Sequence, residues 1–467
     1  MCTFLSPPAQ WAQYEFGFAQ LGDPRRNKRL VNVATKLAVN PGGTLPQAFA
    51  SWAELKGAYR LFNQPQLTYA NILAPHLENT RRLCRQSGEY LIIEDTTLLD
   101  YSGSVAALEL GVIGDGNGRG FELHSALAVR VEGWTLEQRP EGVVVGLVGQ
   151  QCDCPRPRPR GETEAQRWRR PRKSQRWAAA LKEIGPPPQG CQYIYMADRE
   201  ADFYEPFQIC QQLGLAWIIR ARCDRRLADE TGHLEAILAQ QRVMGQMTVE
   251  LRARPGQAAR TAIVEVRAAR VDLDGPWRLG GWQPPLRGLW AVEVKEVDAP
   301  AGVQEPLHWI LLTSLPCQSW AAAQRVVGRY TARWWIEEYH KALKTGAGAE
   351  QSQLERGYRL ESLLAVLAVV AVRLLATKFL ARTRPEGLEA VESFSAEALA
   401  ILEKKLGRPK GGWNNQSVLT ATARLGGFLA RKHDGLPGWQ TIWRGWHRLM
   451  WMCEGVETLK RNSRTCG

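Results

Sequence analysis

The clearest hydrophobic pattern in the chain lies between residues 328 and 348, where GRYTARWWIEEYHKALKTGAG repeats apolar positions with the period of an α-helix. With about 100° between successive residues, one side of this helix collects apolar side chains and predicts a core-facing surface. These residues are Ala332, Trp335, Ile336, Tyr339 and Leu343. The opposite side carries one carboxylate, a phenol and several cations, at Tyr330, Arg333, Glu337, Lys341 and Lys344. That side is either a solvated face supported by Glu–Lys pairs or part of a functional site.

The first 70 or so residues predict a compact helical unit. Asp23-Pro24 is a typical helix start, with a capping carboxylate and a proline at the first helical position. The predicted helix carries several cations in its first turns and stops at the sequence Pro-Gly-Gly that begins at Pro41. Trp52–Phe62 predicts a second helix. The clustered cations suit a DNA-reading module, and a solvated basic face is the alternative.

From about residue 90 the pattern changes to strands that alternate with helices. Tyr90–Glu94 predicts a short apolar strand that ends at Asp95. Two further strands, 124–131 and 142–148, would complete a meander, and the strand 192–197 ends at Asp198. Helices are predicted at about 174–184 and 201–213, and another strand at 215–220. This order of elements favours an α/β domain.

A mostly β region at about 225–315 reads as an insertion into that domain, with strands at 247–253, 261–269, 288–294 and 308–313. The helix predicted at 360–382 contains the most apolar stretch, 363–372, which is too short for a membrane span and suits a buried helix. The final ninety or so residues are helical. A seam of residues there predicts packing against another helix, within the chain or in a second copy: Trp439, Trp443, Trp446, Met450 and Cys453.

Composition adds a polyanionic partner to this picture. The 467 residues include 60 Lys+Arg against 47 Asp+Glu, a net charge of +13 and a pI near 9.4, which favour nucleic acid. A loop rich in arginine and proline at 155–176 suits phosphate contact. The cysteines have no repeated spacing and the N-terminus has no signal-peptide pattern. We therefore expect reduced thiols in a soluble, cytoplasmic protein without a membrane partner.

Three acidic residues far apart in the sequence could form one metal site if the fold brings them together. Asp95 and Asp198 follow predicted strands, and Glu337 lies on the polar helix face. Carboxylate oxygens are the ligands that Mg²⁺ prefers, and two such ions can stabilise both oxygens of an in-line phosphoryl displacement. Spacing alone leaves Glu94 as an alternative to Asp95, and Glu200 and Asp202 as alternatives to Asp198. Glu338 lies about 100° from Glu337, outside the cationic face.

Several motifs together resemble the cut-and-paste DDE transposases of the insertion-sequence-four family. They are EDTT at 94–97, DREAD at 198–202 and the pattern Y-x2-R-x3-E-x6-K formed by Tyr330, Arg333, Glu337 and Lys344. LGDPRRNKRLVNVA near the N-terminus, GAYR at 57–60, AVRLLA at 371–376 and ARLGGF at 423–428 extend the resemblance over nearly the whole chain. One such motif alone would be weak evidence, whereas all of them in order form a specific match.

The resemblance implies a ribonuclease-H-like fold in which Asp95, Asp198 and Glu337 form a catalytic triad that binds two Mg²⁺, or Mn²⁺ in their place. It further implies residues that grip the transposon end, namely Tyr330, Arg333, Lys344 and Arg60 in GAYR. Trp309 matches a tryptophan of the insertion that stacks on a flipped base during hairpin formation, and a packed strand residue is the alternative. The basic loop at 155–176 departs from the family pattern, so no individual DNA contacts are assigned to it.

These inferences predict an α/β protein with three parts. Residues 1–70 would form a helical domain that binds DNA ends, 71–382 the ribonuclease-H-like catalytic domain with its β-rich insertion, and 383–467 a helical dimerisation domain. The implied activity is cut-and-paste transposition: binding of inverted ends by a homodimer, metal-dependent excision through a hairpin, and joining to double-stranded target DNA. The alternatives are a non-catalytic DNA-binding derivative and a nuclease that cuts without joining.

Overall fold

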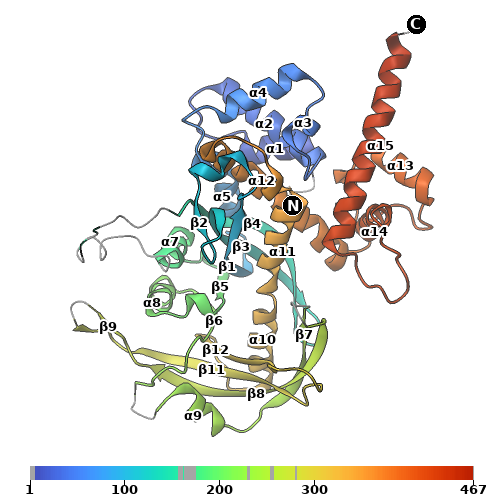
Figure 1. The fold of residues 1–467 in the computed structure, drawn as a ribbon. Helices are drawn as coiled ribbons and strands as arrows, with labels where there is room; N and C mark the ends of the chain where they lie inside the picture. The colour runs from blue at the N-terminus through green and yellow to red at the C-terminus, as the bar shows by residue number, and fades with distance from the viewer. Residues whose placement is uncertain are drawn as a thin grey trace.

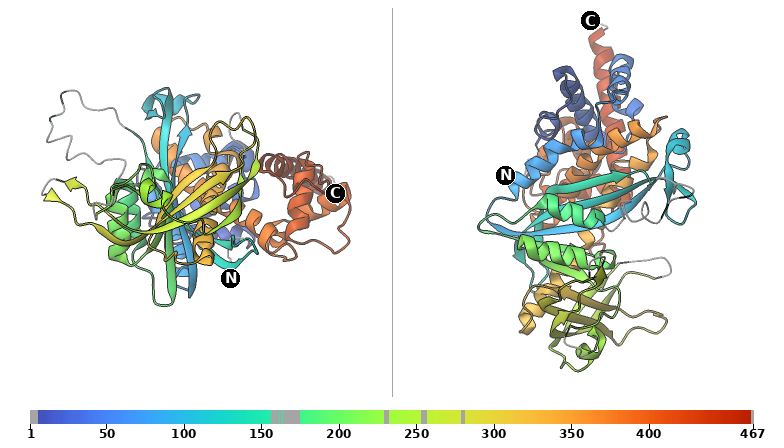
Figure 2. Two further views of the ribbon diagram at one scale, coloured as in Figure 1. Left: turned by 90° about the horizontal axis from the view of Figure 1, so that it is seen from below. Right: turned by 90° about the vertical axis from the view of Figure 1, so that its left-hand side faces the viewer.

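The computed structural model describes residues 6–155, 161, 163, 175–228, 232–252, 257–278 and 281–465. A mixed β-sheet of ten strands forms the centre of the molecule. The N-terminal helices lie at one end of it and the inserted strands at the other, while the C-terminal helices project to one side (Figures 1 and 2).

The N-terminal helices are α1 (Pro8–Phe16), α2 (Pro24–Val39), α3 (Leu45–Ala48), α4 (Trp52–Phe62) and α5 (Tyr69–Leu83). The predicted start of α2 is confirmed, because the carboxylate of Asp23 accepts a hydrogen bond from the backbone N–H of Arg25 at 2.8 Å. The predicted bounds of α4 are also confirmed. Helices α1, α2 and α4 turn apolar faces toward a shared core that continues into the sheet.

The first six strands are β1 (Gly88–Asp100), β2 (Gly111–Ile113), β3 (Gly118–Trp134), β4 (Pro140–Asp153), β5 (Cys191–Ala197) and β6 (Ala216–Arg220). In the order β4-β3-β1-β5-β6, the first three are antiparallel neighbours, and β5 and β6 run parallel to β1. This arrangement is the ribonuclease-H-like core that the sequence predicts. The short helix η2 (Val105–Glu109) lies between β1 and β2.

Alternating side chains of β1 belong to two different cores, one on each face of the sheet. Tyr90 and Ile92 pack in one cluster with side chains of α7 (Gln175–Ile184) and α8 (Tyr204–Leu213). Leu91 and Ile93 pack in the other, with side chains of the helices that follow the inserted strands. Because successive strand residues point to opposite faces, Asp95 shares the side of Leu91 and Ile93.

The sequence places the end of β1 at Glu94, and this prediction is wrong. The antiparallel register with β3 continues as far as Asp100 and Gly120, so Asp95 lies within the strand. The parallel register with β5 stops earlier, at Ile93 and Met196. Asp95 therefore lies just beyond the point where parallel pairing ends, and Asp198 follows the end of β5 directly.

The inserted strands are β7 (Gly245–Leu251), β8 (Arg260–Leu273), β11 (Leu286–Val297) and β12 (His308–Thr313), in agreement with the prediction. The region also contains α9 (Leu234–Ala239) and a small hairpin of β9 (Trp277–Arg278) and β10 (Gly281–Trp282). Strand β12 pairs with β6, so the insertion extends the same sheet instead of forming a separate one.

The segment 328–348 is not the single helix that its pattern predicts. It comprises the end of α10 (Trp320–Thr331), then α11 (Trp334–Lys341) and a π-helical turn, η4 (Ala342–Gly346), before η5 (Ala349–Gln351). Between α10 and α11 the helix narrows to a 3₁₀ turn, because the backbone N–H groups of Ala332 and Arg333 bond to carbonyls three residues earlier. The five predicted core residues are all buried, which confirms the apolar face. Tyr330, predicted on the polar face, is buried as well.

Helix α12 (Gly357–Thr383) contains the predicted buried segment 360–382. Its length and its mean hydropathy of 2.2 over 18 residues would suffice to cross a membrane, but 94% of that window is buried inside the protein. The composition is thus that of a core helix.

The remaining elements are η6 (Val391–Ser393), α13 (Ala396–Leu406), α14 (Asn415–Leu425) and α15 (Trp439–Thr465). Of the predicted seam on α15, Trp439, Trp443 and Trp446 are buried within this chain. Trp451, outside the seam, is 63% exposed. Most of the basic loop at 155–176 lies outside the described residues. At its end, Arg176 forms ion pairs with Glu122 and Asp153.

Candidate active site

The carboxylates of Asp95 and Glu337 face each other across one guanidinium group. Arg333 Nη1 lies 3.4 Å from Asp95 Oδ2, and Arg333 Nη2 lies 2.8 Å from Glu337 Oε1. Helix α11 brings Arg333 and Glu337 to this place because its apolar side packs on β1 and α12. Asp198 enters from the neighbouring strand, β5. The structure therefore pairs Asp95 and Glu337 through Arg333, and the charge of Asp198 acts on Asp95.

The charges of Asp198 and Glu337 both act on the carboxyl group of Asp95. Burial raises the pKa of Asp95 to about 7; the Arg333 cation opposes this rise, and the charges of Asp198 and Glu337 add to it. Burial also disfavours the charge on Arg333, but Tyr330, Asp95 and Glu337 hold its pKa above the usual range. The site thus concentrates more negative charge than Arg333 neutralises, and a further cation would stabilise it.

The donor set fits a hard divalent cation, since carboxylate oxygens are its preferred ligands. Within the described residues, no three acidic, histidine or cysteine side chains lie close enough to hold a metal ion between them. The guanidinium of Arg333 lies between Asp95 and Glu337 and supplies the positive charge there. A metal ion bound by the triad would therefore require Arg333 to move aside.

Geometry narrows the acidic alternatives that spacing left open. Glu94 is buried on the other face of β1, where its carboxylate accepts a hydrogen bond from the Tyr195 hydroxyl at 2.8 Å and lies 3.4 Å from His124. Asp202 is buried and bonded to Arg225 at 2.7 Å. Both carboxylates are occupied by internal partners.

The remaining acid of the DREAD motif, Glu200, is exposed. Its backbone N–H donates to the carboxylate of Asp198 at 2.8 Å, so Asp198 caps the short helix η3 (Arg199–Ala201). Asp95, Asp198 and Glu337 are accordingly the set that the fold gathers.

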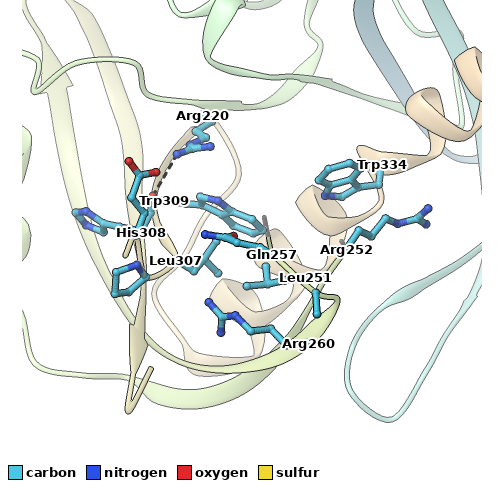
Figure 3. A pocket seen from close by; sticks show the side chains of 12 residues that line it. Arg220, Leu251, Arg252, Gln257, Arg260, Leu307, His308, Trp309 and Trp334 are labelled. Carbon is cyan, nitrogen blue, oxygen red and sulfur yellow. Dashed lines mark hydrogen bonds between the residues drawn. The ribbon is translucent and has the colours of Figure 1, made fainter. Parts of the chain in front are cut away.

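An aromatic pocket of about 270 Å³ reaches Trp334, the residue that follows Arg333 (Figure 3). Trp309 of β12 and Trp334 of α11 line it together with Arg220, Arg252 and Arg260. The Trp309 ring is only 6% exposed and meets the Tyr330 ring edge to face, at 5.3 Å between centroids. Trp309 is thus both a packed strand residue and part of the pocket wall.

Two predicted DNA contacts lie outside this cluster. Lys344, in the π-helical turn η4, forms an ion pair with Glu350 at 3.6 Å and is about one-third exposed. Arg60 is exposed near the end of α4, in the N-terminal helical unit at the top of Figure 1. Tyr330 is buried and its pKa is raised to about 12 by that burial, so its hydroxyl stays neutral.

The sequence did not predict several residues that lie around the site. Trp334 directly precedes the core residue Trp335. Successive residues of a helix lie about 100° apart, so Trp334 points away from the core, and the sequence pattern did not single it out. Arg220 and Arg260 come from strands whose local pattern carries no signal of a pocket. Glu338 is buried and bonded to Lys378 Nζ at 2.7 Å, as well as to Trp439 and Arg252. Its partners on α12 and α15 lie 40 and 101 residues away, which no local pattern reveals.

Two family models match the chain. Residues 8–67 match the model described as Transposase DNA-binding, and residues 369–466 match the model described as Transposase Tn5 dimerisation domain. Among solved structures, the chain is similar to a piggyBac transposase synaptic complex with hairpin DNA, at a TM-score of 0.36 and 10% identity. That similarity covers 86% of this chain and 81% of the other. The assignment to a transposase family rests on the two family models and not on this distant structural similarity.

Proposed function

Because the chain belongs to the Tn5-like transposases of the insertion-sequence-four family, we propose that it excises a DNA element by cut-and-paste transposition. In this proposal each end is cut by hydrolysis, the freed 3′-hydroxyl attacks the opposite strand to form a hairpin, and the reopened end joins target DNA. Each step is an in-line attack by an oxygen on a phosphodiester, so one site can serve all of them. The proposal is supported by the pairing of Asp95 and Glu337 with Arg333, and by the charge of Asp198, which acts on Asp95.

Asp95, Asp198 and Glu337 would hold the divalent metal that this family uses, as two Mg²⁺ ions or Mn²⁺ in their place. When bound, the ions would activate the attacking oxygen and stabilise the leaving one. Arg333, released from the carboxylates, would reach a phosphate of the transposon end. Lys344, one turn beyond α11, would neutralise another.

The aromatic pocket suits a base that has left the helix stack. Trp309 offers an indole for stacking, worth about 1–3 kcal/mol per base. Arg220 would neutralise an adjoining phosphate, whereas Arg252 and Arg260 are paired with Glu338 and Glu296. Tyr330 acts through Trp309, because its buried ring supports the indole from the protein side. We assign the pocket to the flipped base of the hairpin step.

We further propose a division of labour along the chain. Residues 1–70 bind the inverted ends with the help of Arg60, residues 71–382 perform catalysis, and residues 383–467 hold two copies together in a synaptic complex. Such a protein would work in the cytoplasm of a bacterial-type cell, associated with the nucleoid when bound to DNA.

Incubation of the purified protein with Mg²⁺, a donor plasmid carrying the native ends and a target plasmid tests this function. We expect excised element, transient hairpin ends and joined products. Cleavage without hairpins or joined products would point to a nuclease. End binding without any cleavage would point to a non-catalytic derivative.

A further inference from the structure

Glu338, the direct neighbour of Glu337, is the centre of a second polar cluster that the proposed chemistry does not use. Its side chain is 6% exposed and accepts from three donors on three different parts of the chain. Lys378 Nζ comes from α12 at 2.7 Å, the indole N–H of Trp439 from α15, and the guanidinium of Arg252 from the residue after β7. One carboxylate thereby ties α11 to the core, the insertion and the C-terminal helices.

The donors are themselves fixed by further contacts. Lys378 Nζ lies 4.3 Å from the centre of the Trp439 ring, and Trp439 stacks on Trp443 with 5.3 Å between centroids and 11° between planes. Arg252 lies over the ring of Trp334, at 5.8 Å from its centroid. The cluster is thus continuous with the aromatic pocket on one side and with the buried face of α15 on the other.

The apolar face of helix α11, with Trp335, Ile336 and Tyr339, is buried, and the contacts of Glu338 hold its other side. It is eight residues long, from Trp334 to Lys341, and the side chain of the preceding Arg333 donates a hydrogen bond to Glu337 in its first turn. It ends in a π-helical turn, whose Gly346 packs directly against the ring of Trp443. A rotation of the helix that moved Glu338 away from its donors would move Glu337 and Arg333 by a similar arc.

We propose that Glu338 is a positioning residue that sets the orientation of Glu337, and that through Trp439 this orientation depends on the seating of α15. The catalytic carboxylates are then held in register only when the C-terminal helices are docked on α11 and α12. The inference rests on the proposed function, because it concerns the geometry of that site.

A matched pair of substitutions separates positioning from stability. Trp439→Phe removes the N–H that reaches Glu338 and keeps a ring over Lys378. Trp443→Phe removes an N–H that is buried and has no hydrogen-bond partner within the described structure. The two residues stack on each other in the same helix, so their losses of packing are comparable.

The experiment measures two quantities for the full-length wild type and both variants. The first is the affinity for Mn²⁺ alone, followed by its electron paramagnetic resonance signal. The second is the rate of end cleavage against Mg²⁺ concentration at saturating end DNA. For Trp439→Phe we expect a Mn²⁺ dissociation constant and a half-saturating Mg²⁺ concentration about three to tenfold higher, with end-DNA binding unchanged. Trp443→Phe keeps an aromatic ring against Gly346 and loses no hydrogen bond to Glu338, so it should stay close to the wild type in both.

Equal behaviour of the two variants would overturn the inference while leaving the proposed function intact. A wild type that neither binds Mn²⁺ nor cuts would overturn the proposed function, and this inference with it. Glu338→Gln combined with Lys378→Met guards against a purely structural effect, since it removes charge from both partners. A folded double variant with weak Mn²⁺ binding would support positioning, and one with wild-type Mn²⁺ binding would contradict it.

Discussion

Glu337 and Glu338 are consecutive residues whose surroundings differ in almost every respect. The Glu337 side chain is 28% exposed and shares Arg333 with Asp95 in a site that has an excess of negative charge. The Glu338 side chain is 6% exposed and accepts from two cations and an indole N–H. Under the proposed function Glu337 would bind a further cation, whereas Glu338 already has three donors within the protein.

The largest expected difference between the two is in the rate of cleavage. Glu337→Gln should reduce cleavage of end DNA on the order of a thousandfold or more, because it removes a carboxylate that we propose as a metal ligand. Glu338→Gln should reduce it on the order of tenfold, because it acts through orientation. Single-turnover cleavage at saturating DNA measures both. Similar losses in the two variants would break the comparison.

The order of effects should reverse for stability. Glu338→Gln should lower the free energy of unfolding by about 1–3 kcal/mol, because it leaves the partly exposed Lys378 and Arg252 without their charged partner. Glu337→Gln should change it little, since it relieves repulsion from Asp95 while it weakens an Arg333 contact. Urea denaturation in the presence of EDTA provides the measurement. A greater loss for Glu337→Gln would contradict the assignment of roles.

The raised pKa of Asp95 predicts that the free energy of unfolding of the metal-free protein depends on pH. Between its ordinary pKa near 3.8 and the folded value of about 7, folded Asp95 keeps a proton that the unfolded chain releases. The free energy of unfolding therefore falls as pH rises through that window.

Asp95→Asn removes the carboxyl group that causes this pH dependence. The free energy of unfolding of the variant, relative to that of the wild type, should therefore rise by up to about 1.4 kcal/mol per pH unit between pH 4.5 and 6.5. Urea denaturation in EDTA at several pH values tests the slope. A stability difference that stays constant over this range would show that Asp95 titrates normally.

The smallest expected effects concern two lysines. Lys344, 31% exposed beside Glu350, should contribute less than about 1 kcal/mol of stability. Its replacement by Ala should weaken end binding and reduce the salt dependence by about one charge. Lys378→Ala should lower the free energy of unfolding and leave the salt dependence of end binding unchanged. Binding titrations at several salt concentrations distinguish them, and a salt slope unaffected by Lys344→Ala would remove Lys344 from the DNA contacts.

Local patterns predicted the features that neighbouring residues decide. The apolar stripe from Ala332 to Leu343, the capped start of α2 at Asp23 and the bounds of α4 all depend on spacing within a few turns. The strands of the insertion were also predicted, because their alternation reflects one buried face.

The errors arose where distant segments decide the outcome. Strand β1 runs past Glu94 because β3 continues to pair with it, and Tyr330 is buried because Trp309 of β12 packs on it. The partners of Glu338 come from three parts of the chain, so the pattern of α11 could exclude it from the cationic face but could not show its contacts.

Asp198→Ala offers the most direct test of the central claim, that three carboxylates from β1, the end of β5 and α11 form one site for DNA strand cleavage. The wild type and the variant would be compared for end binding by gel shift and for cleavage of labelled end DNA in Mg²⁺. We predict full binding and no strand cleavage, hairpin or joining by the variant. Cleavage at the wild-type rate by Asp198→Ala would contradict the account.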